Sequence, residues 1–173
     1  MPPIFHVSKR IEKEAAEIYY GEDRFKLKDV CNVDCFAGEI WLRHLRKIRT
    51  VTCTWDESTT GATNGFQALA RMTSLAELVI RTDEKKMLQK MLYSEKRHQR
   101  TVLKEPTPQQ QLLILQFPGM RALLSLSGLR RMKFAKKYNN KGIAYGGPIP
   151  GGVLQTQVAA KLRKSREGKT TPG

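Results

Sequence analysis

Residues 48–53 read IRTVTC, and the same pattern of apolar side chains returns at residues 75–80 (LAELVI) and 129–134 (LRRMKF). Each copy is apolar at its first, fourth and sixth positions, so its last three residues alternate as the residues of a strand do. The copies begin 27 and then 54 residues apart, which is one interval followed by twice that interval. Such a pattern, with helical sequence between copies, is typical of leucine-rich-repeat solenoids. We call these segments the repeated strands, and we expect them to be neighbours in one sheet.

The sequence around the repeated strands predicts helices behind the sheet. Apolar residues recur at helical spacing in residues 7–20 and 34–46, whereas residues 24–28 (RFKLK) alternate as a further half-buried strand would. Between the second and third repeated strands the sequence is helical, and residues 107–110 (TPQQ) form a strong helix start. The Asn or Cys ladder of the standard leucine-rich repeat is missing. We therefore predict an α/β fold over residues 1–135, with a small, irregular leucine-rich-repeat-like parallel or mixed sheet backed by helices.

The last part of the chain is basic and rich in glycine. Residues 135–173 carry eight Lys and Arg and one acidic residue, whereas residues 1–134 carry 23 and 15. Glycine, proline and asparagine dominate residues 138–152, a composition typical of flexible segments. Residues 153–164 have apolar side chains four apart and predict one weak helix. We therefore predict that residues 136–173 form a flexible basic tail.

The segment FHVSKRIEKEAAEIYYGEDRFKL, residues 5–27, resembles a signature of a large group of uncharacterised fungal proteins. In that group an F-box-like opening segment leads into a helix and a strand, and a second helix and strand follow. The usual start of the opening segment, Leu-Pro-x-Glu-Ile, is missing here. The resemblance implies leucine-rich-repeat-like β–α units across residues 5–134, and it carries no activity to transfer. The matching positions are Val7–Ile11, Glu14–Ala15, Tyr20–Phe25, Ile48–Val51 and Trp55.

Few residues have the spacing of a catalytic or metal site. Cys31 and Cys35 are separated by three residues and lie near His44, whereas zinc knuckles use C-x2-C pairs. Cys53 belongs to a repeated strand, which favours a place in the core. Three cysteines at irregular spacing fit reduced thiols in a cytoplasmic or nuclear protein, and no run of apolar residues is long enough for a membrane span. We predict that the protein is not an enzyme and uses no metal or cofactor.

The net charge of +15 indicates an acidic partner. The residues between the apolar positions of the repeated strands, together with Arg81 directly after the second one, face away from the core and include five positive charges and one negative charge. Repeat proteins commonly bind partners on such a face. We therefore predict a non-enzymatic interaction module that binds an acidic protein partner. The predicted partner-binding residues are Arg49, Thr52, Arg81, Arg130, Arg131 and Lys133.

The alternative is a nucleic-acid-associated protein, such as a peripheral ribonucleoprotein component. In this interpretation the basic tail and the sheet face neutralise backbone phosphates. Aromatic residues interleaved with basic ones are few, so we expect no sequence-specific reading of RNA. The predicted phosphate-binding residues are Lys136, Lys137, Lys161, Arg163, Lys164 and Arg166.

Overall fold

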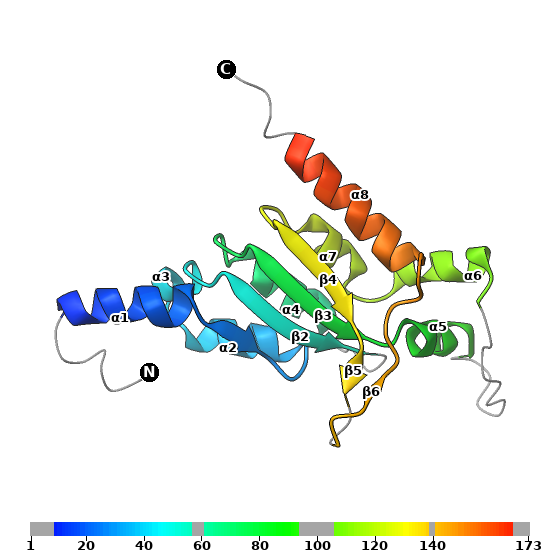
Figure 1. The fold of residues 1–173 in the computed structure, drawn as a ribbon, viewed down its shortest axis with the longest axis horizontal. Helices are drawn as coiled ribbons and strands as arrows, with labels where there is room; N and C mark the ends of the chain where they lie inside the picture. The colour runs from blue at the N-terminus through cyan, green and yellow to red at the C-terminus, as the bar shows by residue number, and fades with distance from the viewer. Residues whose placement is uncertain (1–8, 57–60, 94–105, 139–140, 168–173) are drawn as a thin grey trace.

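The computed structural model describes residues 9–56, 61–93, 106–138 and 141–167, and beyond residue 160 it describes the backbone alone. Helices and strands alternate through most of this part of the chain (Figure 1). The elements in chain order are α1 (Lys9–Gly21), β1 (Arg24–Lys26), α2 (Asn32–Glu39), α3 (Leu42–Leu45), β2 (Thr50–Trp55), α4 (Ala62–Ala70), β3 (Glu77–Thr82), α5 (Glu84–Tyr93), α6 (Pro108–Leu112), the 3-10 helix η2 (Leu113–Gln116), α7 (Met120–Ser125), β4 (Arg131–Ala135), β5 (Lys137–Tyr138), β6 (Ala144–Tyr145) and α8 (Val153–Glu167).

The main sheet has four parallel strands, and their order in space, β1-β2-β3-β4, is their order along the chain. The repeated strands are β2, β3 and β4. Val51 is the direct neighbour of Leu78, and Leu78 is the direct neighbour of Met132. All three side chains are buried. The predicted α/β fold with a small sheet backed by helices is therefore confirmed.

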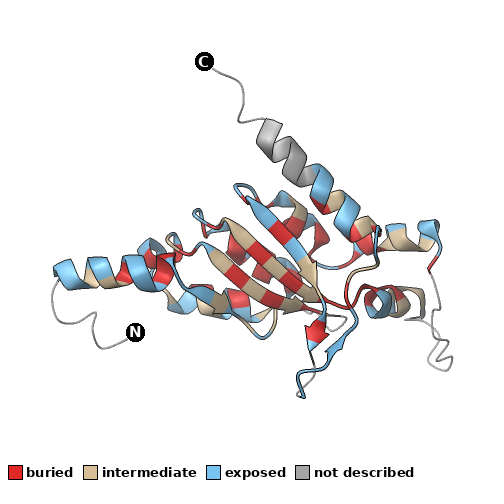
Figure 2. Ribbon diagram, in the orientation of Figure 1, coloured by how far each residue is buried: buried red, intermediate tan, exposed pale blue. Residues whose placement is uncertain are grey.

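The alternation of side chains determines which face of the sheet is buried. In β2 and β3, half-buried and fully buried residues alternate over the whole strand. The buried residues join those of α2, α4 and α7 in one hydrophobic core, and these helices lie behind the sheet in Figures 1 and 2. At the end of β2, Trp55 packs edge-on against Phe66 of α4 and Phe117, with ring centres 5.2 and 5.6 Å apart.

One close backbone contact positions α4 beside α2. Gly65 of α4 lies against the carbonyl group of Val30, immediately before α2. A Cβ atom on Gly65 would come within 2.0 Å of the Val30 oxygen, a distance that no side chain tolerates. The absence of a side chain at Gly65 therefore sets the spacing between these two helices.

The helix expected over residues 34–46 is two helices. α2 ends at Glu39 and α3 begins at Leu42, because Ile40 adopts an extended backbone conformation (φ −97°, ψ 133°). The break turns His44 and Leu45 of α3 into the interior. The apolar spacing continues across the break, so periodicity alone predicts a single helix.

The connection between β3 and β4 is helical, as the sequence predicts. α5, α6, η2 and α7 are the elements that the structure describes there. At the start of α6, the Thr107 hydroxyl accepts the backbone N–H of Gln110, and the Gln110 side chain accepts the backbone N–H of Thr107. This reciprocal pair is the capping arrangement that the TPQQ segment indicates.

The segment after β4 differs from the expected flexible tail. β5 and β6 form an antiparallel hairpin, and α8 follows it. Leu154 and Val158 of α8 are buried in the same hydrophobic core as the sheet. The Glu84 carboxylate accepts the backbone N–H of Ile149 at 2.7 Å, which attaches the segment before α8 to the start of α5. The described residues up to 160 therefore pack as part of the domain, because two apolar side chains four apart supply α8 with a buried face.

The second face of the main sheet is open. In the described part of the chain no helix lies over it, and this face is turned toward the viewer in Figures 1 and 2. Parallel sheets are usually covered on both faces, and their strands are then apolar on both sides. Here the outward residues are largely polar and half-buried or exposed. The open face is consequently the part of the sheet that a partner can reach.

Candidate functional site: the open face of the sheet

We define the open face as the side chains that alternate with the buried ones along β1 to β4. Paired residues of neighbouring strands point to the same side of a sheet, so the register arranges these side chains in rows. The rows are Arg24-Thr50-Glu77-Arg131, Lys26-Thr52-Val79-Lys133 and Thr54-Arg81-Ala135.

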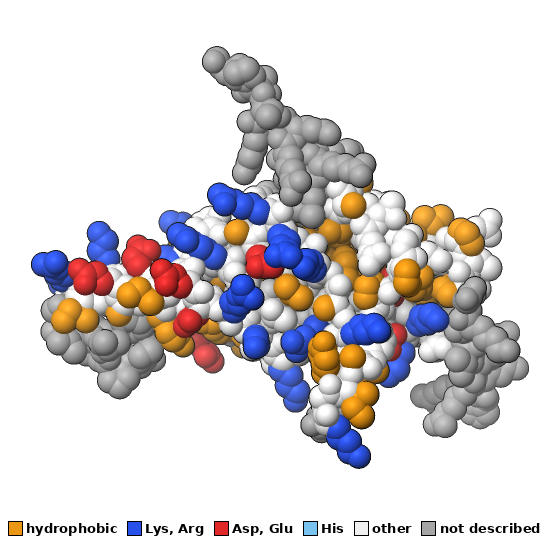
Figure 3. Space-filling view, in the orientation of Figure 1, with side chains coloured by type: hydrophobic (Ala, Val, Ile, Leu, Met, Phe, Trp, Pro, Cys, Tyr) orange, Lys and Arg blue, Asp and Glu red, His pale blue; other side chains and the backbone are white. Residues whose placement is uncertain are grey.

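Basic side chains lie on both outer strands of the open face. β1 contributes Arg24 and Lys26, β4 contributes Arg131 and Lys133, and all four are exposed. The inner strands contribute three half-buried threonines from β2 and, from β3, half-buried Glu77, Val79 and Arg81, whose two opposite charges cancel. In the space-filling view, Lys and Arg side chains are spread over this face among neutral ones (Figure 3). The open face therefore has a centre that is mostly neutral, between two basic margins.

The acidic residue of the open face is already paired. The Glu77 carboxylate lies 3.3 Å from the guanidinium of Arg131 on the neighbouring strand, and the Arg131 side chain is 56% exposed. Exposed ion pairs contribute only about 0–1 kcal/mol, because water and salt screen them. An acidic ligand can therefore replace Glu77 as the partner of Arg131 at small cost.

The β5–β6 hairpin adds an aromatic surface at the carboxyl end of the strands (Figure 1). The Arg81 guanidinium lies 5.3 Å from the ring centre of Tyr138, and the Lys86 ammonium lies 5.6 Å from that of Tyr145. Such cation–π contacts join the hairpin to the basic residues of β3 and α5. Tyr138 is 54% exposed and Ile143 is 59% exposed, so the hairpin also presents apolar side chains to solvent.

The predicted partner-binding residues lie together but not all on strands. Thr52, Arg81, Arg131 and Lys133 belong to the open face, as the alternation predicts. Arg49 and Arg130 precede β2 and β4, and they line a cavity of about 450 Å³ at the amino end of the sheet. The structure therefore brings all six residues to the open face or to its amino-terminal border.

The predicted phosphate-binding residues divide into three groups. Lys136 is exposed between β4 and β5. Lys137 is buried, and its ammonium lies 3.6 Å from the Asp56 carboxylate. The prediction for Lys137 is therefore corrected, because a buried and paired ammonium cannot approach a phosphate. Lys161, Arg163, Lys164 and Arg166 lie on α8, where the structure describes the backbone alone.

Sequence reasoning missed two parts of this surface. Arg24 and Lys26 belong to the open face, although the predicted site drew only on the repeated strands. The alternation of RFKLK is the signal that places them there, because it puts Phe25 on the buried side. Tyr138 and Tyr145 had no comparable signal, because they are distant in sequence from the basic residues of β3 and α5.

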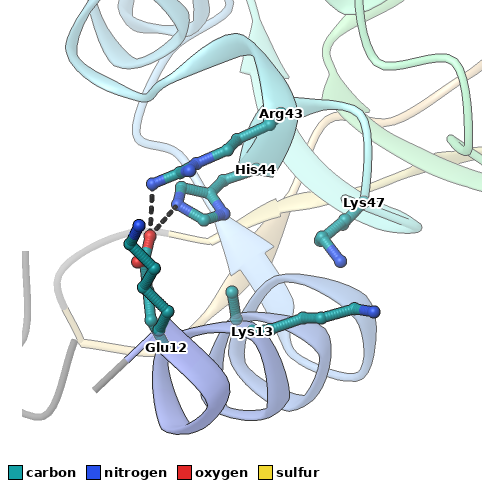
Figure 4. Close-up of a pocket in the computed structure, with 7 residues that line it drawn as sticks. Glu12, Lys13, Arg43, His44 and Lys47 are labelled. Atoms are coloured by element: carbon teal, nitrogen blue, oxygen red, sulfur yellow. Dashed lines mark hydrogen bonds and ion pairs between the residues drawn. The ribbon is translucent and has the colours of Figure 1, made fainter. Parts of the chain in front are cut away.

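A second hollow lies between α1 and α3 (Figure 4). It has a volume of about 290 Å³, and Lys9, Lys13, Arg43, His44 and Lys47 are among the residues that line it. The Arg43 side chain bonds to Glu12, and the Lys47 side chain bonds to Glu17. Burial lowers the pKa of His44, so the imidazole is uncharged at neutral pH. Carboxylates of α1 thus already neutralise two cations of this hollow, which makes it a weaker anion site than the open face.

Two of the three thiols, those of Cys31 and Cys53, offer little reactivity. Cys53 is fully buried in β2, and burial raises the pKa of its thiol to about 12. Burial also raises the pKa of Cys31, which lies beside Asp29. Thiolates are the reactive form, so neither residue is prepared for nucleophilic attack at neutral pH. Among the described residues, no three His, Cys, Asp or Glu side chains are grouped so that they could hold a metal ion.

Comparisons of the chain with protein-family models, with curated proteins and with solved structures find no match. The resemblance of residues 5–27 to a fungal group therefore stays a prediction. In the described residues, none of the helices combines the length and the apolar character that a membrane span needs.

Proposed function

We propose that the protein is a non-enzymatic interaction module that binds an acidic protein partner on the open face of its sheet. One observation carries the proposal: in the described residues no helix covers the second face of a parallel sheet, and that face is basic at both margins. Exposing such a face without a partner is uncommon for parallel sheets, which are normally covered on both sides. The positive charge would attract an acidic partner and orient it during the encounter.

The distribution of charge supports a protein partner. Protein interfaces typically have a centre depleted of charge and a polar rim. The threonine methyl groups and Val79 give the open face such a centre, and Lys26 and Lys133 lie at the two ends of the same row. A nucleic-acid backbone would gain nothing from the neutral centre. The three free cysteines fit a reducing compartment, and we propose the cytoplasm or the nucleus.

The β5–β6 hairpin supports nucleic-acid binding as the second candidate function. Proteins that hold single strands combine basic grooves with aromatic rings on which bases stack. Tyr138 is exposed and lies beside Arg81, so a base could stack on its ring while Lys133 or Lys136 neutralises a phosphate. This role would use the same face as the protein partner. The two candidate functions therefore compete for one surface, and substitutions on that surface test both.

The proposal is tested by purifying the protein from its native cells with and without nuclease treatment. We expect the same protein partner in both samples, and we expect the variant Arg81→Glu/Arg131→Glu/Lys133→Glu to lose it. Lys13→Glu/Arg71→Glu/Arg121→Glu is the matched control, because it changes the charge equally at exposed positions outside the sheet, on α1, directly after α4 and on α7. A partner that both variants retain would contradict the proposal, and a partner that nuclease removes would favour the nucleic-acid function.

A further inference from the structure

The two margins of the open face carry cations at matching positions. On β1 the exposed residues Arg24 and Lys26 are two positions apart, as are the exposed residues Arg131 and Lys133 on β4. Two positions along a strand correspond to a rise of about 6.6 Å. The register places Arg24 and Arg131 at the two ends of one row, and Lys26 and Lys133 at the two ends of the next. The open face is therefore bordered by two parallel pairs of positive charges.

The distance between the margins suits one helix. β1 and β4 are separated by three strand spacings, because β2 and β3 lie between them (Figure 1). Three spacings of about 4.8 Å amount to roughly 14 Å. An α-helix with its side chains is about 10–12 Å across, so one helix that runs along the strands fits between the margins. Half-buried Thr52 and Val79 lie at the centre of the middle row, and their short side chains allow such a helix to approach closely.

The hydrogen bonding of the central strands also favours a helix. β2 and β3 are paired on both sides, so the backbone groups of their paired residues are used within the sheet. A segment that lies over the centre must therefore satisfy its own N–H and C=O groups. A single extended segment leaves those groups without partners, whereas an α-helix pairs all but its terminal ones internally. Helices are also the elements that normally cover the faces of parallel sheets.

The spacing of the cations specifies where such a helix carries its acidic residues. Residues four apart on a helix lie on the same side with a rise of about 6 Å, which matches the cation pair of each margin. Carboxylates at positions i and i+4 on both borders of a narrow apolar stripe would therefore face all four cations. A second copy of this chain does not suit the open face, because each copy carries a net charge of +15.

We propose that the acidic partner binds through an amphipathic α-helix that lies along the strands, between the two basic margins. Its apolar stripe would lie over Thr52 and Val79, and its two rows of carboxylates would contact the cations of β1 and β4. The inference rests on the proposed function, and it adds the conformation and the charge pattern of the partner segment. The partner would then supply the helical layer that no described element places on the second face of the sheet.

The test measures binding of two fluorescent peptides to the full chain by anisotropy. Both peptides have one sequence of about 14 residues, the helical length that spans a six-residue strand. The sequence has Glu at i and i+4 on both borders of a stripe of Ala and Leu, and one peptide contains D-residues that prevent helix formation. We expect the all-L peptide to bind at least about tenfold more tightly, because only a helix presents both rows of carboxylates at once.

Both margins should contribute to binding of the all-L peptide. We expect Arg24→Gln/Lys26→Gln and Arg131→Gln/Lys133→Gln each to weaken binding about threefold or more, the size expected from two exposed ion pairs. The methyl NMR signals of Val79 should shift when the peptide binds, because the apolar stripe lies over them. Lys13→Gln/Arg121→Gln is the charge-matched control at exposed positions on α1 and α7, and it should leave the affinity nearly unchanged.

The outcomes separate this inference from the proposed function. Equal affinity for the two peptides, with both margin variants weakening both, would overturn the helix and leave an acidic partner on the open face. A loss confined to one margin variant would show a ligand along a single edge of the sheet and would also overturn the inference. Binding of neither peptide would overturn the inference, and the purification experiment would then decide the proposed function by itself. Tighter binding of a single-stranded oligonucleotide of equal charge would overturn the inference and the proposed function together.

Discussion

At the scale of single residues, size decides where backbones can meet. Gly65 allows α4 to lie against the Val30 carbonyl, because a Cβ atom at this position would lie 2.0 Å from the Val30 oxygen. The residue carries no polar group and acts through the absence of a side chain. The packing of α4 against the chain before α2 therefore depends on glycine at this single position.

Replacing Gly65 with alanine is expected to destabilise the protein strongly. The new Cβ would lie 2.0 Å from the Val30 oxygen, so α2 and α4 must separate. Overpacking of this kind costs about 3 kcal/mol or more of the free energy of unfolding. Urea denaturation measures the change. Gly38→Ala in α2 is the control, because no atom lies within 4 Å of its added Cβ and stability should be unchanged or slightly higher. Equal losses in the two variants would contradict the packing argument.

At the scale of elements, α8 depends on distant contacts. Its own sequence predicts only a weak helix, and burial of Leu154 and Val158 against the core supplies the remaining stability of the helix. The buried Glu84 also holds the segment before α8 in place, because its carboxylate accepts a hydrogen bond from the backbone N–H of Ile149. Burial raises the pKa of Glu84, and hydrogen bonds from the Ile149 and Leu154 backbone oppose that rise.

The raised pKa of Glu84 predicts a pH dependence of stability. The folded protein binds the proton more tightly than the unfolded chain, whose carboxyl has a pKa of about 4.3. The contribution of Glu84 to stability is therefore fully present below that value and is lost as pH rises through the raised pKa. Glu84→Gln removes this titration. Urea denaturation of both proteins between pH 4 and 8 should show the wild type losing stability relative to Glu84→Gln as pH increases. Parallel pH profiles would show that Glu84 ionises normally in the folded protein.

At the scale of the whole molecule, one sheet serves two purposes. Its buried face holds a continuous core with α2, α4, α7 and α8, and its open face carries the charge available to a partner (Figures 2 and 3). Because the two sets of side chains alternate on the same strands, substitutions on the open face can change binding without disturbing the core. The hairpin and α8 complete the domain after the last strand of the sheet.

Truncation tests whether the domain ends where the repeated strands end. A chain ending at residue 135 loses the buried side chains Leu154 and Val158. Burial of each contributes roughly 1.5–3 kcal/mol, so the truncated chain should lose about 3–6 kcal/mol of unfolding free energy. Thermal and urea denaturation measure the loss, and a chain ending at residue 167 should retain the stability of the full chain. Unchanged stability after truncation at 135 would restore the interpretation of residues 136–173 as a separate tail.

The salt dependence of binding distinguishes the two candidate functions. A nucleic acid that makes some six phosphate contacts should lose about 10³-fold in affinity between roughly 50 and 200 mM salt, because bound counterions are released. A protein partner on a face with a neutral centre should lose far less. Anisotropy titrations over this range measure the slope for the partner that purification identifies. A steep slope with that partner would contradict the protein-binding proposal.

The sequence alone determined the strands of the main sheet and the alternation of their side chains between its two faces. Alternation within residues 48–53, 75–80 and 129–134 is local, and the 27- and 54-residue intervals leave room for the helices between strands. The tertiary structure decided what lies on each face, because the helices of the described residues cover one side only and Arg24 joins the open face through pairing with β2. The tertiary structure also decided that the segment before α8 packs against the start of α5, since the Glu84–Ile149 hydrogen bond joins residues 65 positions apart. Contacts at such separations depend on the folded chain as a whole, and no local pattern of residues encodes them.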